Sequence, residues 1–165
     1  MGKTISNTIQ WREYESENEL PDEEMELIKA AIETSANAYA PYSGFMVGAA
    51  VRLENGLIIR GTNIENSAFP SGICAERNAL STSASCYPDV RPVAIAIAAR
   101  VSGEITDEPA SPCGNCRQVI AEEEYRNHHP VKIILKGKSK VIVIDKGGDL
   151  LPLQFKPETL RPNSP

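Results

Sequence analysis

Apolar and polar residues follow the period of a helix in residues 22–40. The apolar positions recur every three or four residues, at Met25, Ile28, Ala31 and Ile32, which is typical of an amphipathic helix. Asp22 is placed to cap this helix, and the carboxylates that follow it suit the positive end of the helix dipole. The pattern therefore predicts a helix that begins near Asp22 and is ended by Pro41.

Three segments show the pattern of strands. Residues 45–54 and 57–63 are rich in apolar residues, and Asn55 and Gly56 separate them. Asn-Gly between two such runs is the strongest short-range signal for a β-hairpin. Residues 92–100 are almost entirely apolar, as in a strand that is buried on both faces.

In the remaining chain, segments with the pattern of a helix alternate with segments with the pattern of a strand. This predicts helices at residues 74–86 and 113–124 and strands at residues 131–135 and 141–144. Helices that alternate with apolar strands indicate an α/β fold, here a three-layer α/β/α sandwich with a five-stranded mixed sheet. A chain of 165 residues is long enough for one core, so we expect residues 21–165 to form a single domain. Residues 1–20 are polar and could be an added strand or a loose arm.

Composition narrows the classes of partner. The 17 basic and 22 acidic residues give a net charge of -5, no long basic block occurs, and aromatic residues make up 5%. These values argue against a nucleic-acid partner. The apolar runs are far too short to cross a bilayer, and no stretch has the pattern of a signal peptide. We therefore expect a cytoplasmic protein with a small-molecule substrate and no membrane partner.

Three of the four cysteines occur in two short motifs. Residues 71–77 read SGICAER, and residues 112–116 read PCGNC. A C-x-x-C spacing at the start of a helix lets both sulfurs bind one ion. Structural zinc sites have four protein ligands, whereas catalytic sites have three and keep one position for water. The absence of a fourth candidate ligand therefore predicts a catalytic Zn²⁺ site formed by Cys74, Cys113 and Cys116.

The other reactive residues receive different interpretations. Glu76 lies beside this site without being needed as a ligand, which is the position of a general base. His128 and His129 are expected to be solvated in a loop, and Cys86 to be a buried free thiol. A zinc-stabilised binding module without catalysis is the alternative, and the missing fourth ligand disfavours it.

These motifs resemble the zinc-dependent cytidine deaminase family, and specifically its small homotetrameric branch. The match rests on C-A-E-R at residues 74–77 and S-P-C-G-x-C-R-Q at residues 111–118. Further segments of the family pattern follow in unbroken order, at residues 42–50, 61–66 and 150–157. Several separately spaced motifs in order are far more specific than a single C-x-x-C.

The resemblance implies hydrolytic deamination of cytidine and deoxycytidine in pyrimidine salvage. It also implies one Zn²⁺ per subunit and a homotetramer with shared active sites. Glu76 would move protons between water, the ring and the departing amine. The resemblance also implies the substrate contacts. Phe45 would contact the base, and the backbone carbonyl of Ala75 would bind the amino group. Asn63 and Glu65 would bind the ribose hydroxyls, and Phe155 would reach a neighbouring subunit's site.

The negative charge of the predicted zinc site must be offset by nearby positive charge. Three thiolates on Zn²⁺ leave a formal charge of about -1, which opposes the acidification of bound water. Helix N-termini near the cysteines would offset this charge, because each carries roughly half a positive charge. By resemblance, Arg77 would also donate a hydrogen bond to a cysteine sulfur and withdraw charge from it.

Two residues depart from the family pattern, and both bear on the sugar end of the substrate and on subunit packing. Gly44 stands where a longer residue is common, and Phe69 replaces a frequent tyrosine. The alternative enzyme is a deaminase of a modified cytosine nucleoside such as blasticidin S, but Arg77 and Glu65 favour cytidine. The polynucleotide-editing branch uses histidine as its first ligand and needs a basic surface, so it fits poorly.

Overall fold

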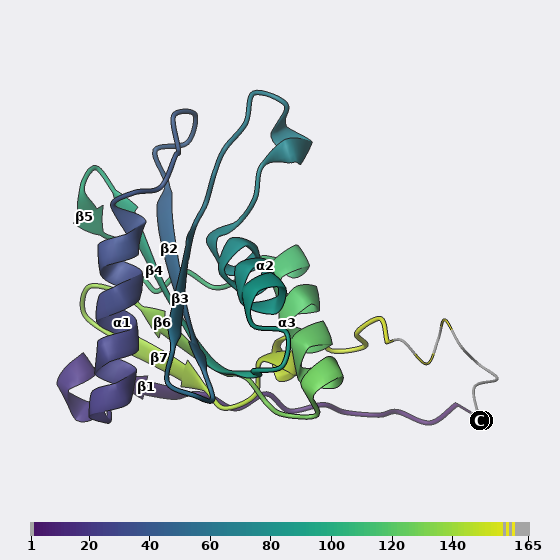
Figure 1. Ribbon diagram of the computed structural model, residues 1–165. Helices are drawn as coiled ribbons and strands as arrows, with labels where there is room; N and C mark the ends of the chain where they lie inside the picture. Colours follow the sequence, from purple (N-terminus) through teal and green to yellow (C-terminus); the bar gives the residue numbers. More distant parts are fainter. Residues whose placement is uncertain (1, 157, 159, 161–165) are drawn as a thin grey trace.

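A mixed β-sheet runs through the middle of the protein in this computed structural model, which describes residues 2–156, 158 and 160 (Figure 1). Within these residues the sheet has seven strands, in the order β1-β7-β6-β4-β2-β3, with β5 paired to β4. Only β4 and β6 are parallel, and every other described pair is antiparallel. The strands are β1 (Arg12–Tyr14), β2 (Met46–Leu53), β3 (Ile58–Thr62), β4 (Pro92–Val101), β5 (Glu104–Ile105), β6 (Lys132–Lys136) and β7 (Val141–Ile144).

The five predicted strands are all present, but the predicted strand count was too low by two. The additional strands are β1 and β5, which have three and two residues. The strand β5 folds back on the end of β4 across Ser102 and Gly103, whose φ angles are 53° and 87°. Such short strands carry no period of their own, so they depend on a neighbouring strand for their formation.

Helices cover both faces of the sheet, which confirms the three-layer arrangement. The helix α1 (Asp22–Ser35) covers one face, whereas α2 (Ala75–Cys86) and α3 (Gly114–Asn127) cover the other (Figure 1). No helix in the described part of the chain combines the length and the apolar character needed to cross a membrane.

The predicted ends of α1 need correction. Pro21 is the N-cap, and Asp22 is the first helical residue. The helix ends at Ser35, well before Pro41, because the following segment pairs with the chain after β3. There the backbone N–H of Tyr39 donates to the carbonyl oxygen of Asn63 at 3.1 Å.

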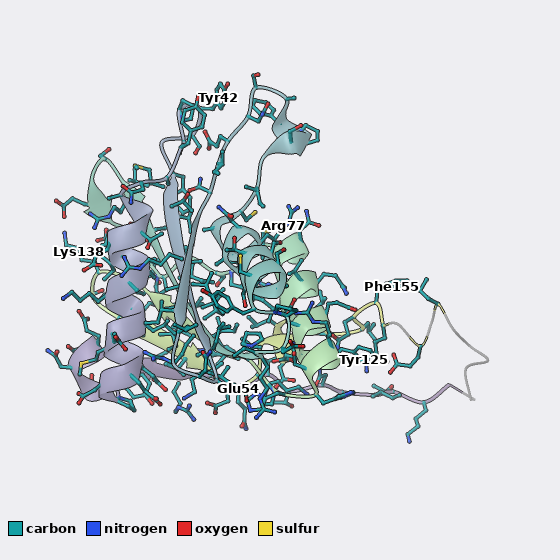
Figure 2. The ribbon with its side chains drawn as sticks, viewed as in Figure 1. Tyr42, Glu54, Arg77, Tyr125, Lys138 and Phe155 are labelled. Atoms are coloured by element: carbon teal, nitrogen blue, oxygen red, sulfur yellow. The ribbon has the colours of Figure 1, made fainter. Side chains whose placement is uncertain are left out.

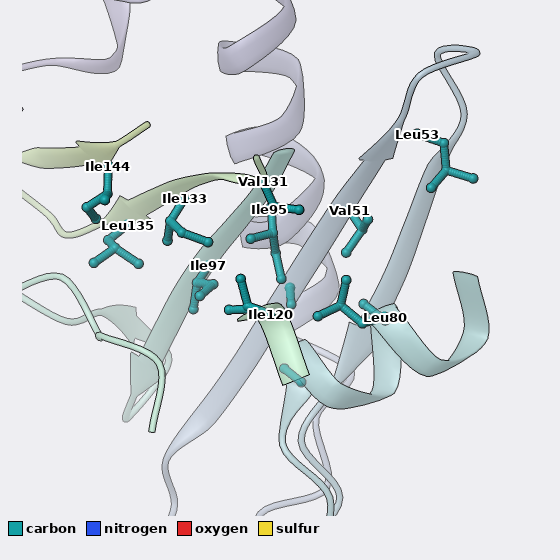
Figure 3. Close-up of a cluster of buried hydrophobic side chains, with 13 residues drawn as sticks. Val51, Leu53, Leu80, Ile95, Ile97, Ile120, Val131, Ile133, Leu135 and Ile144 are labelled. Atoms are coloured by element: carbon teal, nitrogen blue, oxygen red, sulfur yellow. The ribbon is translucent and has the colours of Figure 1, made fainter. Parts of the chain in front are cut away.

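The core lies on both sides of β4, whose side chains alternate between the two helical layers. Ile95 and Ile97 belong to the core cluster beneath α2 and α3, which Figure 3 shows around Ile120 and Leu80. The alternate positions are alanines, which belong to the cluster under α1: Ala94, Ala96 and Ala98. Because this strand is buried on both faces, its sequence is a nearly unbroken apolar run.

Part of the segment at residues 1–20 packs against the sheet. Its strand β1 pairs antiparallel with β7, and Leu20 is buried in the cluster under α1. The carboxylate of Glu17 forms an ion pair at 2.6 Å with Lys136, whose side chain is buried on β6. Hydrogen bonding to Lys136 lowers the pKa of Glu17 below its ordinary value. Residues 12–20 thus cover a sheet edge and supply a partner for a buried ammonium group.

Candidate metal centre and adjoining cavity

The three predicted cysteine ligands meet where α2 and α3 begin. Cys74 is the N-cap of α2 and Cys113 is the N-cap of α3, and neither side chain makes a capping hydrogen bond. Both sulfurs therefore remain free for a metal. Cys116 follows in the first turn of α3 and is buried. The three Sγ atoms all lie within 4.8 Å of one another.

The spacing of these sulfurs fits tetrahedral zinc. Four ligands about 2.3 Å from a tetrahedral Zn²⁺ lie about 3.8 Å apart. The Sγ atoms of Cys74 and Cys113 are 3.8 Å apart, and those of Cys113 and Cys116 are 3.4 Å apart. The geometry therefore provides three corners of a zinc tetrahedron.

The electrostatics of the three thiols also suit a cation. Burial raises the pKa of Cys116 and of Cys74 above their ordinary values. Burial acts in the same direction on Cys113, but the nearby backbone N–H groups of Cys116 and Asn115, together with the neighbouring thiols, bring its pKa below the ordinary value. A lowered pKa is the expected effect of a helix N-terminus on a thiol. A bound cation would stabilise all three as thiolates.

The described residues supply no fourth ligand to this group. His128 and His129 lie at the opposite end of α3, where His128 is the exposed C-cap. The prediction for Cys86 was wrong, because this thiol is exposed. It is the last residue of α2, where the chain leaves the core. The metal centre thus keeps an open position, as a catalytic site requires.

Glu76 occupies the first turn of α2 between the cysteines and the core. Its side chain is buried, with only 5% of the residue exposed, and it lines the same cavity as Cys74 and Cys113. Burial raises the pKa of this carboxyl above its ordinary value. A buried carboxyl with a raised pKa is better suited than an ordinary carboxylate to hold a proton and pass it on.

A cavity of about 590 Å³ opens next to the metal centre. Two segments that project from the same end of the sheet form its walls, one leading into β2 and one linking β3 to α2 (Figure 1). Its size is within the usual range for small-molecule sites. The residues predicted to contact substrate that line it are Phe45, Asn63, Glu65 and Ala75.

Asn63 fixes the start of β2 through both ends of its amide group. Its Oδ1 accepts a hydrogen bond from the backbone N–H of Val47 at 2.7 Å. Its Nδ2 donates to the carbonyl oxygen of Phe45 at 2.9 Å. Asn63 therefore holds Phe45 at the cavity wall, and one N–H of the amide is left for another acceptor.

Three predicted site residues do not line this cavity: the ligand Cys116, which is buried in α3, Phe155 and Arg77. Phe155 does not line it, and its backbone oxygen accepts from Gln118 at 3.1 Å on the outer side of α3 (Figure 2). Arg77 lies in the first turn of α2 (Figure 2). The hydrogen bonds of the described residues include none from its guanidinium to a cysteine sulfur, so its role as charge corrector stays a prediction.

Sequence reasoning missed some residues at the site. Arg117 donates to the carbonyl oxygens of Pro112 at 2.8 Å and Leu150 at 3.1 Å, and so supports the backbone just before Cys113. Arg117 lies in the C-R-Q motif at residues 116–118, and this position was the sequence signal that could have indicated its role. Phe69, which the sequence related to the sugar end of the substrate, lines the cavity, and its contact with Tyr42 was the part not predicted: the two rings pack edge-on, with centroids 5.8 Å apart. This aromatic pair joins positions far apart in the chain, so no local pattern predicts it.

Comparison with known proteins adds to this geometry. Residues 21–128 match the model of the cytidine and deoxycytidylate deaminase zinc-binding region. The chain is 43% identical over 136 residues to cytidine deaminase of Sporosarcina psychrophila, covering 81% of this chain and 92% of that protein. It is 47% identical over 96 residues to the Halalkalibacterium halodurans enzyme, covering 58% of this chain and 68% of that protein.

Solved structures agree with these sequence matches. The crystal structure of cytidine deaminase from Burkholderia pseudomallei superposes with a TM-score of 0.68 at 36% identity, covering 79% of this chain and 98% of that one. The matched family region is a zinc-binding region, and the three-cysteine centre with its open position suits that metal. The chain therefore belongs to the cytidine and deoxycytidylate deaminase family.

Proposed function

We propose that this protein hydrolyses cytidine and 2′-deoxycytidine to the corresponding uracil nucleosides and ammonia, as a step in pyrimidine salvage. One observation carries the proposal: an open three-cysteine centre lies beside a buried glutamate in a cavity of about 590 Å³. The relatives named above are cytidine deaminases. A purely structural zinc site would not need an open position.

The protein's own groups would move the protons of this reaction. When bound, Zn²⁺ lowers the pKa of water to about 7 and so supplies a nucleophile at neutral pH. Glu76 would take a proton from the attacking water and deliver it to the ring nitrogen. Once the water oxygen is bonded to the ring carbon, Glu76 would move that oxygen's remaining proton to the amine, so that the carbon–nitrogen bond breaks, ammonia leaves and a carbonyl group remains. Burial of Glu76 keeps bulk water from competing for these protons.

The cavity residues would orient the nucleoside. The backbone carbonyl of Ala75 would accept from the exocyclic amino group, and Phe45 would contact the base. Asn63 and Glu65 would bind a sugar hydroxyl, as donor and acceptor respectively. The support for these roles is that all four residues line the cavity beside Glu76.

Excess negative charge from three thiolates would be offset at the helix N-termini. Cys74 and Cys113 are both N-caps, so the dipoles of α2 and α3 point their positive ends at the metal. Arg77, one residue after Glu76, would add a full positive charge close by. Its charge lowers the pKa of Glu76, although burial outweighs it.

Ammonia release from cytidine tests the proposal directly. We expect zinc-loaded protein to release one ammonia for each uridine formed, measured by a coupled ammonia assay and by chromatography of the nucleosides. Treatment with a chelator should abolish release, and added Zn²⁺ should restore it. Release from blasticidin S alone would move the assignment to a modified cytosine nucleoside. No release from any cytosine nucleoside, with zinc bound, would leave a binding module.

We also propose that the protein assembles as a homotetramer in which Phe155 completes a neighbouring subunit's site. The support is that Phe155 is 57% exposed and does not line the cavity of its own chain. Phe155→Ala should therefore raise the KM for cytidine, whereas Leu153→Ala, at a fully exposed position, should not. Light scattering would give the mass of the active species. A monomer with full activity would contradict this assembly.

A further inference from the structure

The carboxylate of Glu65 is held by the loop that precedes β2. Its Oε2 accepts hydrogen bonds from the backbone N–H groups of Tyr42 at 2.8 Å and Ser43 at 3.3 Å. Its Oε1 accepts from the Ser43 hydroxyl. Glu65 follows β3, so these three bonds join two segments that are more than 20 residues apart. Both segments are walls of the cavity.

The direction of the Ser43 hydrogen bonds is fixed by its neighbours. The backbone N–H of Phe45 donates to the Ser43 Oγ at 2.9 Å. Because Glu65 as a carboxylate only accepts, the single hydroxyl proton of Ser43 points to Oε1. The hydroxyl therefore links Phe45, at the base end of the proposed substrate, to Glu65 at the sugar end.

Gly44 lets this link form. Its φ of +66° is in the left-handed region, which favours glycine. This turn brings the N–H of Phe45 back to the hydroxyl two residues earlier. The departure from the family pattern at Gly44 thus belongs to the same local structure as Ser43. A Cβ atom added at position 44 would meet no other atom within 4 Å, but a residue other than glycine would be strained in this left-handed backbone conformation.

The Glu65 carboxylate has few hydrogen-bond acceptor sites left for the substrate. An ionised carboxylate has about four acceptor sites, two on each oxygen. Both sites on Oε2 and one on Oε1 are used by Tyr42 and Ser43. One site on Oε1 remains, so Glu65 can accept from one hydroxyl without losing its contacts to the loop. Ser43 lowers the pKa of Glu65, which keeps the carboxylate ionised.

We propose that Ser43 is a positioning residue for sugar recognition, which orients Glu65 so that Oε1 accepts from one sugar hydroxyl. This inference rests on the proposed nucleoside substrate. It predicts that Ser43 matters only for nucleosides that carry such a hydroxyl. A residue that merely stabilised the loop would affect every nucleoside to the same extent, because all of them would meet the same displaced Phe45.

Three nucleosides separate these roles: cytidine, 2′-deoxycytidine and 2′,3′-dideoxycytidine. We expect Ser43→Ala to raise the KM for cytidine and for 2′-deoxycytidine about tenfold, the usual effect of losing a hydrogen bond to a charged group. The kcat should change little. The KM for 2′,3′-dideoxycytidine, which lacks both ring hydroxyls, should stay as in the unsubstituted protein, because Asn63 still holds Phe45 through its carbonyl oxygen and through the N–H of Val47.

Two variants serve as controls. Ser43→Thr keeps the hydroxyl and should restore most of the affinity for cytidine. Ser139→Ala removes an exposed hydroxyl in the turn between β6 and β7 and should change none of the three KM values. Equal losses for all three nucleosides in Ser43→Ala would overturn the inference, and so would no loss for cytidine.

A binding measurement separates this inference from the proposed reaction. Calorimetry with the same nucleosides is done on zinc-loaded Glu76→Gln protein, with and without Ser43→Ala. If the unsubstituted protein releases no ammonia but binding shows the same dependence on the sugar hydroxyl, the reaction is wrong and the role of Ser43 stands. No binding of any nucleoside would overturn both.

Discussion

Replacing Glu76 with glutamine is expected to abolish ammonia release from cytidine while zinc stays bound. Glutamine has nearly the same shape, so it can fill the buried position in the first turn of α2. It cannot accept a proton from water or pass one to the ring. Proton transfer by a positioned side chain contributes roughly a hundred- to ten-thousand-fold to a rate, and here one group would serve several transfers. We therefore expect kcat to fall by at least about a thousandfold.

A matched variant controls for the loss of a buried carboxyl. Glu123 is also buried in a helix, and burial raises its pKa as well. It contacts Arg126 and Asn127 near the end of α3, away from the metal centre. Glu123→Gln should therefore keep the kcat for cytidine. Zinc content and circular dichroism verify both variants, and a Glu76→Gln protein within tenfold of full activity would refute the role of Glu76.

The main elements of the fold could be predicted because each has a period or a turn signal of its own. The hairpin of β2 and β3 follows from Asn55 and Gly56, and β4 from its apolar run. The short strands β1 and β5 could not be predicted in this way. They have too few residues for a period, and they form because β7 has an unpaired edge and the end of β4 extends past β6.

The metal centre was predictable because its geometry is local. Cys113 and Cys116 share one helix turn, and only Cys74 must arrive from another element. The hydrogen bonds to the Glu65 carboxylate come from a loop more than 20 residues earlier in the chain. No local sequence pattern around Glu65 therefore predicts them. Exposure of Cys86 likewise depends on where α2 leaves the core, which composition does not indicate.

The position of Glu76 depends in turn on a glycine in β3. A Cβ atom added to Gly61 would lie 2.5 Å from the backbone nitrogen of Ala79 and 2.6 Å from the carbonyl oxygen of Ala75. Both are backbone atoms of α2, so the helix would have to move as a body. The contact is thus a direct mechanical link between the sheet and the start of α2, where Cys74 and Glu76 lie.

We therefore expect Gly61→Ala to lower the free energy of unfolding by about 3 kcal/mol, the upper end of the usual cost of overpacking. The displaced α2 should also carry Cys74 away from the other sulfurs, so zinc should be lost to a competing chelator at lower chelator concentrations. Urea unfolding and chelator titration measure the two effects. Gly114→Ala is the control, because the added Cβ would meet nothing within 4 Å. Unchanged stability and zinc retention in Gly61→Ala would mean that α2 is not held against β3 at this point, and that another contact positions Glu76.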